Sequence, residues 1–228
     1  MAKQNVAEQE TLGEAMNKTE LFFQKNGRLV TYIFLALLVI AALVFGYRSL
    51  IVQPRIEKAA EMIAQAQARF EAENPDFELA LQGDANGAGF LDVIDQYGST
   101  PSGNLAKHYA GICYLRMGDL ENAAAYLAKF SPVKGIPGAL INAQNYGLQG
   151  DVAVEQGNYA AAVKFYEKAV AAADNNMTAP MYLRKAGLAE QAQGNTEKAA
   201  AYYERILTSY PASMEAREAE KLLGGATK

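Results

Sequence analysis

Cysteine and histidine are almost absent from this sequence of 228 residues, which has one of each, Cys113 and His108. A single cysteine excludes an intrachain disulfide and leaves the compartment open, and a single histidine excludes a metal site built on two histidines. Cys113 and His108 do not fit the roles of a nucleophile and its base. They are five residues apart on one predicted helix, so their side chains point in directions that differ by about 140°. We therefore expect Cys113 to be a small core residue.

An excess of basic residues is also missing. The formal net charge is −4, which disfavours a nucleic-acid partner because phosphate binding needs a basic face. The glycines Gly83, Gly87 and Gly89 follow no predicted strand and lack the Lys-Ser/Thr of a phosphate loop. We therefore expect no cofactor, no metal and no enzymatic activity, and a degradative or lytic enzyme is disfavoured.

The sequence does contain a long apolar run, the nineteen uncharged residues Leu29–Tyr47. A helix of that length spans about 28 Å, close to the ~30 Å hydrocarbon core of a bilayer. A cleaved signal peptide is the alternative, but the run is too long and ends in Phe45-Gly46-Tyr47-Arg48 without an Ala-x-Ala pattern. A buried core helix would carry a polar stripe. The run predicts an uncleaved transmembrane helix over residues 29–47.

Charge does not orient this helix. Three basic residues lie close to each side of it, so the positive-inside bias is balanced: Lys18, Lys25 and Arg28 before, and Arg48, Arg55 and Lys58 after. Residues 1–28 form a short extramembrane tail with apolar residues loosely at helical spacing. This tail is either a weakly amphipathic segment at the membrane surface or a docking helix for a membrane partner.

Three copies of one pattern follow in the body of the chain. Each copy has two glycines seven residues apart, then an alanine five residues later, then a large apolar or aromatic residue after four more. The copies are Gly111, Gly118, Ala123 and Leu127; Gly150, Gly157, Ala162 and Tyr166; and Gly187, Gly194, Ala199 and Tyr203. The pattern resembles the tetratricopeptide repeat, whose unit is about 34 residues. It predicts an all-α fold in which one N-terminal transmembrane helix precedes an α-solenoid.

Each repeat position has a physical role. The first glycine lets the second helix of a pair approach the first, and the second glycine favours the left-handed conformation of a reversal. The alanine lies where the two helices are nearest, and the large residue fills the groove to the next repeat. Asp119, Asn158 and Asn195 follow the second glycines and are able to cap the second helices.

The remaining segments complete the solenoid. Residues 104–211 hold the three repeats, with a loop at 131–138 inserted after the first and with Pro180 and Pro211 at repeat boundaries. Residues 55–101 predict a degenerate helical hairpin with a polar loop at 83–89 between its helices. Residues 212–223 predict a helix that caps the open end.

A short motif ahead of the apolar run carries a further resemblance. Phe22-Phe23-Gln24-Lys25-Asn26-Gly27, followed by one membrane helix and the repeats, resembles the YfgM-like family, ancillary subunits of the bacterial Sec translocon. The resemblance implies a single-pass protein of the inner membrane, with a cytoplasmic N-terminus and a periplasmic repeat domain. It also implies translocon subunits, secreted proteins or periplasmic chaperones as partners. The alternative is a tethered adaptor of another envelope complex, in cell division or outer-membrane assembly.

The first helices of the repeats predict a groove for these protein partners. A groove of mixed apolar residues with few charges suits an apolar segment, extended or helical. The alternative is that the helix at Ile56–Phe70 or the capping helix of the same chain covers this surface. The candidate residues are Leu105, His108, Ile112, Leu115 and Arg116 in the first repeat, Gln144, Asp151, Val154 and Glu155 in the second, and Met181, Arg184, Leu188 and Gln191 in the third.

Overall fold

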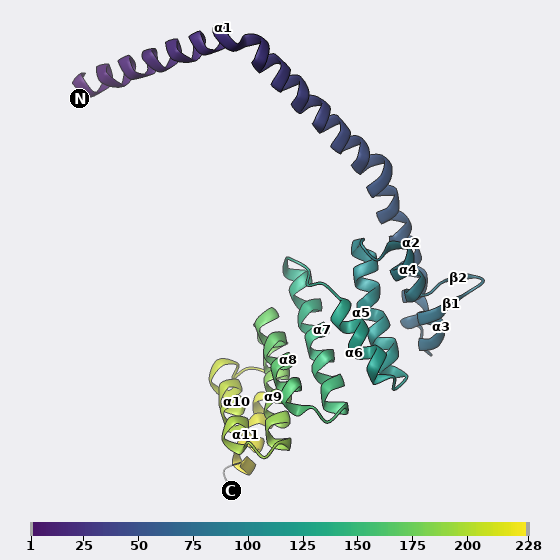
Figure 1. Ribbon diagram of the computed structural model, residues 1–228. Coiled ribbons are helices and arrows are strands. Elements are labelled where there is room, and N and C mark those ends of the chain that lie inside the picture. Colours follow the sequence, from purple (N-terminus) through teal and green to yellow (C-terminus); the bar gives the residue numbers. More distant parts are fainter. Residues whose placement is uncertain (1, 227–228) are drawn as a thin grey trace. The chain divides into compact units, whose positions relative to one another are not determined.

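The computed structural model describes residues 2–226 of the chain, and it describes side chains for residue 22 and residues 24–224. The chain divides into two compact units, Met1–Pro54 and Arg55–Lys228. Helices make up nearly all of the regular structure in the described residues, and the predicted all-α class with a solenoid of helix pairs is confirmed (Figure 1).

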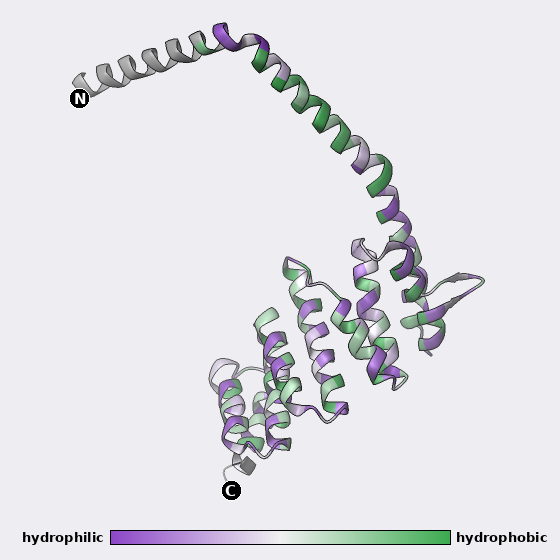
Figure 2. Ribbon diagram, viewed as in Figure 1, coloured by the Kyte–Doolittle hydropathy of each residue, from purple (hydrophilic) through white to green (hydrophobic). Residues whose placement is uncertain are grey.

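The first unit is helical throughout its described residues. Helix α1 (Ala2–Tyr47) bends at Asn26, whose φ of −116° and ψ of 15° are not helical, and the π-helix η1 (Arg48–Val52) follows it. Figure 2 shows the apolar run of residues 29–47 as a hydrophobic band on this helix. By length and composition, the helical stretch Gln24–Phe70 is able to cross a membrane, and its apolar window is not buried in the described residues. Most side chains of the predicted tail lie outside the described residues.

The second unit begins with a more elaborate segment than the predicted helical hairpin at 55–101. A third helix, α3 (Phe77–Gln82), and a two-stranded antiparallel ribbon, β1 (Gly83–Asp84) and β2 (Gly87–Ala88), lie between α2 (Gln53–Phe70) and α4 (Phe90–Tyr97). The predicted polar loop is therefore this ribbon.

Arg69 holds the ribbon in place. Its guanidinium donates to the carbonyls of Gly87 and Ala88 at 3.1 and 3.4 Å, and it pairs with Asp84 at 2.6 Å. These contacts join residues 15 to 19 positions apart in the sequence. The local composition of the segment therefore could not reveal them.

Three helix pairs and a final helix follow, each helix packed on its neighbours in the chain. The pairs are α5 (Pro101–Arg116) with α6 (Leu120–Lys129), α7 (Ile136–Glu155) with α8 (Tyr159–Ala172), and α9 (Ala179–Ala192) with α10 (Thr196–Ser209). The bounds differ slightly from those predicted. The inserted loop ends at Gly135 because Ile136 already begins α7, and the last helix, α11 (Ala216–Ala226), begins four residues later than expected.

The first glycine of each repeat lies directly under the large residue of the same repeat. A Cβ atom at Gly150 would lie 2.5 Å from Cε1 of Tyr166, and one at Gly187 would lie 2.4 Å from Cε1 of Tyr203. Leu127 covers Gly111 in the same way. Two of these residues also reach the next repeat, as predicted: the ring of Tyr166 stacks on Tyr182 of the third repeat with centroids 6.5 Å apart, and Leu127 packs with Val152 of the second. The bare backbone of each glycine lets the side chain settle on the partner helix of its own pair.

The turns within the pairs behave as predicted except at one cap. The second glycines have positive φ, at 80°, 73° and 79° for Gly118, Gly157 and Gly194. Asp119 and Asn158 each accept a hydrogen bond from a backbone N–H in the first turn of the following helix. Asn195 does not cap its helix. Its amide instead donates to the buried Glu190 at 2.6 Å, which satisfies a carboxylate that the fold has removed from water.

Candidate partner-binding site

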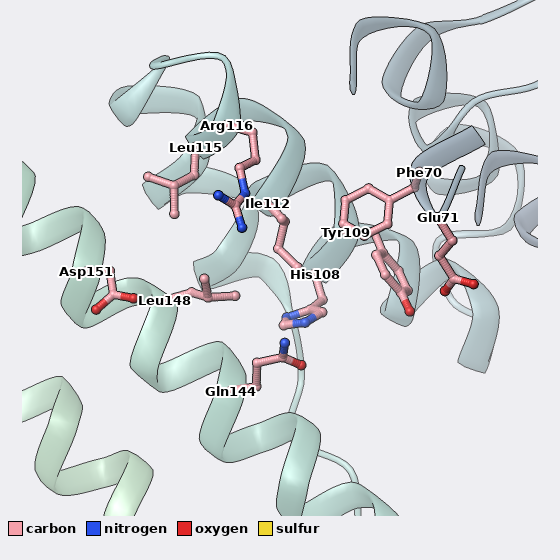
Figure 3. Close-up of a pocket in the computed structure, with 10 residues that line it drawn as sticks. All are labelled: Phe70, Glu71, His108, Tyr109, Ile112, Leu115, Arg116, Gln144, Leu148 and Asp151. Atoms are coloured by element: carbon pink, nitrogen blue, oxygen red, sulfur yellow. The ribbon is translucent and has the colours of Figure 1, made fainter. Parts of the chain in front are cut away.

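A cavity of about 630 Å³ opens between α5 and α7, beside the end of α2 (Figure 3). Side chains from the first helices of two repeats form most of its lining, and two residues at the end of α2 complete it. The lining consists of Phe70, Glu71, His108, Tyr109, Ile112, Leu115, Arg116, Gln144, Leu148 and Asp151.

The repeat register explains why two aliphatic side chains line this junction. Ile112 and Leu148 occupy the positions one after and two before the first glycine of their repeats, and both face the cavity. At the next junction the same two positions hold Asp151 and Lys185, whose charged atoms are 2.7 Å apart. An ion pair therefore bridges the second junction, whereas two aliphatic side chains line the first.

Aromatic packing supports the wall of the cavity on the side of α2. The ring of Tyr109 stacks on Phe90, with centroids 5.1 Å apart and planes 5° apart, and Phe70 meets Tyr109 edge to face at 5.1 Å. Such aromatic pairs stabilise beyond the area that they bury. The wall is consequently part of the packed core that α2, α3, α4 and α5 form together.

His108 is placed differently from the prediction, which treated it as a groove residue free to meet a partner. It is buried, and its Nδ1 lies 3.1 Å from Nδ2 of Asn145 in the next repeat. Because an amide nitrogen only donates, Nδ1 accepts, and the neutral ring carries its proton on Nε2. Burial lowers the pKa of His108 to about 4, although a hydrogen bond with Gln144 opposes this shift. The imidazole is thus a neutral part of the junction at neutral pH.

Two opposite charges flank the cavity. Arg116 lies at the end of α5 and Glu71 just beyond the end of α2, on opposite sides of His108 and Tyr109 in Figure 3. Neither side chain forms an ion pair with any residue whose side chain the structure describes. The exposed amide of Gln144 lies beside His108. The cavity lining therefore combines aliphatic side chains with a cation, a neutral amide and an anion.

The structure brings six of the thirteen predicted groove residues to this cavity, and the other seven lie elsewhere. Leu105, Val154 and Met181 pack against the core clusters, while Glu155 and Leu188 are exposed. Arg184 pairs with Glu218 of α11 at 3.0 Å, and Gln191 accepts a hydrogen bond from Tyr203 at 3.3 Å. The six are His108, Ile112, Leu115, Arg116, Gln144 and Asp151.

The two helices of the self-covering alternative each contact one end of the predicted surface. The capping helix α11 reaches Arg184 of the third repeat through Glu218. At the other end, α2 borders the cavity with Phe70.

Four lining residues were missed by sequence reasoning. Tyr109 and Leu148 stand two residues before the first glycines of their repeats, so the repeat register could have found them. Phe70 and Glu71 follow no glycine pattern, and only the packing of α2 against α5 brings them to the site.

Cys113 is buried, as predicted for a small core residue. Burial raises the pKa of its thiol to about 12, so the reactive thiolate is not populated near neutral pH. Among the residues whose side chains are described, no three His, Cys, Asp or Glu residues gather to hold a metal ion.

Comparison with protein-family models agrees with the helix pairs. Residues 106–131 and 182–213 match one model of the tetratricopeptide repeat, and residues 143–176 match a second. The body of this chain contains tetratricopeptide repeats. Repeats of this type indicate a scaffold for protein–protein interactions. Each matched segment begins inside the first helix of one of the three pairs.

Two solved structures with a similar fold are both of MamA. One, described as the crystal structure of MamA, is 20% identical over 66% of this chain and 91% of that chain, with a TM-score of 0.45. The other, described as the crystal structure of MamA protein, is 19% identical over 74% of this chain and 87% of that chain, with a TM-score of 0.47. No curated protein matches the sequence.

Proposed function

We propose that this protein is a membrane-anchored scaffold that holds short, extended segments of partner proteins in the cavity between α5 and α7. The observation that carries this proposal is the cavity itself, which at about 630 Å³ has room for a few amino-acid side chains. The aliphatic side chains that line it belong to a repeat architecture whose usual ligands are proteins.

The lining indicates the chemistry of the bound segment. An apolar side chain would rest against Ile112 and Leu148, and the Gln144 amide would bond to the peptide backbone. Arg116 favours an acidic group at one end of the segment, and Glu71 favours a basic group at the other. Such an arrangement would fix the direction of the bound peptide as well as its central residue.

The membrane placement comes from the sequence. In this proposal residues 29–47 cross a bacterial inner membrane, with residues 1–28 in the cytoplasm and the repeats in the periplasm. The resemblance to the YfgM-like family supports a role at the Sec translocon, where the repeats would assist protein export or periplasmic chaperoning. The same architecture would also serve a tethered adaptor in cell division or outer-membrane assembly.

Site-specific photocrosslinking in living cells tests the cavity. A photoreactive phenylalanine analogue at Gln144 should capture partner proteins, because this exposed side chain lines the cavity. The matched control is Glu155, which is exposed on the same helix but lies outside the cavity. Adducts at residue 144 and not at 155 are expected, and equal yields at both positions would contradict the proposal.

The identity of the crosslinked proteins distinguishes the export role from the adaptor role. Translocon subunits, secreted proteins or periplasmic chaperones would support the export role. Division proteins or outer-membrane assembly factors would replace it with the adaptor role. Topology is tested with a reporter fused after Lys228: alkaline phosphatase there should be active, and an inactive fusion beside a working cytoplasmic reporter would overturn the placement.

A further inference from the structure

The connections between the repeats each present a large apolar side chain to solvent. Ile136, at the start of α7, is 84% exposed, Met177 before α9 is 70% exposed, and Met214 before α11 is 91% exposed. Val133 and Leu140 are also exposed beside Ile136. A single exposed apolar side chain is ordinary on a protein surface, but here one recurs in each of these three connections, and this recurrence points to an apolar environment outside the solenoid.

The turns inside the repeats differ in composition. The turns at residues 117–119, 156–158 and 193–195 consist of Gly, Asp, Asn and Gln apart from Met117. These turns lie on the opposite edge of the solenoid, because consecutive helices run antiparallel (Figure 1). Exposed apolar side chains are therefore concentrated on the first edge, whereas Met117, which is 42% exposed, lies on the opposite one.

Hydrogen bonds tie the apolar edge to the start of α2. Arg55, in the first turn of α2, donates to the carbonyl of Gln96 at the end of α4 at 2.9 Å. Asn104, in the first turn of α5, exchanges two hydrogen bonds with Ser131 in the next connection, at 2.7 and 2.8 Å. The start of α2, the start of α5 and the connection before α7 consequently lie along one edge.

The same edge continues to the C-terminal end. The hydroxyl of Tyr210, at the end of α10, donates to Asp174 in the connection before α9. This bond joins the connections that carry Met177 and Met214. We name the connections at residues 130–136, 173–178 and 210–215, together with the start of α2, the entry edge, because the chain enters the repeats there.

We propose that the entry edge rests on the lipid surface of the membrane, with Ile136, Met177 and Met214 inserted among the lipid headgroups. The inference rests on the membrane anchoring contained in the proposed function. Arg55 lies only eight positions after Tyr47, the end of the apolar run. Eight residues reach about 12 Å as a helix and about 28 Å when fully extended, so an anchored chain keeps the start of α2 near the bilayer.

The distribution of the side chains favours lipid over a protein partner. The exposed apolar side chains form separate groups, one at each connection, with Met177 and Met214 standing singly, whereas the core of a protein interface is a contiguous apolar patch. Single side chains bind a bilayer weakly, but the anchor makes their contact intramolecular and so raises their effective concentration. The edge carries charges of both signs, including Lys134 and Asp174, so its contact should not depend on anionic lipid.

The test uses the full chain, reconstituted in vesicles of phosphatidylethanolamine and phosphatidylglycerol. Single-cysteine variants Ile136→Cys, Met177→Cys and Met214→Cys are labelled with an environment-sensitive fluorophore, and lipids with a nitroxide near the headgroup serve as quenchers. Cys113 is buried and does not compete for the label. The controls are Gln156→Cys and Thr196→Cys, exposed positions on the opposite edge.

We expect the nitroxide lipids to quench the label at residues 136, 177 and 214 and to leave residues 156 and 196 unchanged. The same quenching should persist when phosphatidylglycerol is omitted. Equal quenching at all five positions, or at none, would overturn the inference. A blue-shifted label at the entry edge that nitroxide lipids do not quench would also overturn it, because a protein then covers the edge.

The outcomes separate this inference from the proposed partner site. Quenching at the entry edge without crosslinks at residue 144 would overturn the partner site alone. Crosslinks at residue 144 without quenching would overturn the lipid contact alone. If alkaline carbonate strips the full chain from the vesicles, residues 29–47 do not anchor it, and the lipid contact falls with the anchor.

Discussion

The hydroxyl of Tyr166 donates a 2.8 Å hydrogen bond to the Oδ1 atom of Asp151, one residue beyond the glycine on which the tyrosine ring lies. Burial and this carboxylate raise the pKa of Tyr166, so the phenol stays protonated and remains a donor. The same carboxylate binds Nζ of Lys185 at 2.7 and 2.8 Å. Asp151 thereby links both helices of the second repeat to the first helix of the third.

Replacing this carboxylate should weaken the second junction. Asp151→Asn removes the ionic partner of Lys185 and leaves the Tyr166 hydroxyl with a weaker acceptor. Hydrogen bonds to charged groups contribute about 1.5–3 kcal/mol, and partial exposure reduces that value here, so we expect a loss of about 1–2 kcal/mol. Urea unfolding of the 55–228 unit measures it. Lys185→Met is the matched variant, and a double mutant with fully additive losses would show that the pair does not interact.

Overpacking distinguishes the repeat interior from its surface. Ala162 is fully buried between the helices of the second pair, whereas Ala171 of the same helix is exposed. Ala162→Leu should lower the free energy of unfolding by about 1–3 kcal/mol, because a dense core has no space for three more carbons. Ala171→Leu should leave the thermal midpoint nearly unchanged. Equal tolerance at the two positions would refute the assigned register.

Charge at two equivalent groove positions should have unequal effects. Ile112 is 8% exposed and lines the cavity, whereas Leu188, at the same position of the third repeat, is 38% exposed. Ile112→Glu should destabilise the 55–228 unit by several kcal/mol, because it buries an unpaired carboxylate. Leu188→Glu should leave thermal unfolding almost unchanged, since its carboxylate reaches water. Similar melting of the two variants would contradict the burial of Ile112.

A test of the proposed binding role of this cavity needs a substitution that disturbs folding less than Ile112→Glu does. Arg116→Ala removes an exposed charge without opening the core, so folding should persist while crosslinking from residue 144 falls. Unchanged crosslinking would show that Arg116 does not contact the bound segment.

His108 should make stability depend on pH. Its pKa falls from 6.5 in the unfolded chain to about 4 in the fold, so the unfolded state binds the proton more readily. The neutral junction is therefore fully stable above pH 6.5 and loses stability as the pH falls from 6.5 to 4, by about 3 kcal/mol in total. Urea unfolding at several pH values measures the loss. His108→Gln should remove this component, and identical pH profiles for the two proteins would refute it.

The sequence by itself determined the helix pairs, because their signals act locally. A glycine and the aromatic residue sixteen positions later lie on two helices joined by one short turn, so their contact is readable from spacing. The left-handed Gly118 and the cap at Asp119 follow from the same short-range chemistry. The apolar run of residues 29–47 is likewise a property of composition.

Only the tertiary structure decided which of the predicted groove residues line the cavity and which are buried elsewhere. His108 is buried at the junction between the first two repeats because Asn145, 37 residues away, contacts its ring. Phe70 and Glu71 reached the cavity because α2 packs against the first repeat without any repeat motif of its own. The side chain of Asn195 does not cap its helix, because its amide donates to the buried carboxylate of Glu190. Each of these outcomes depends on which polar group loses water when helices pack, and spacing along a single helix does not carry that information.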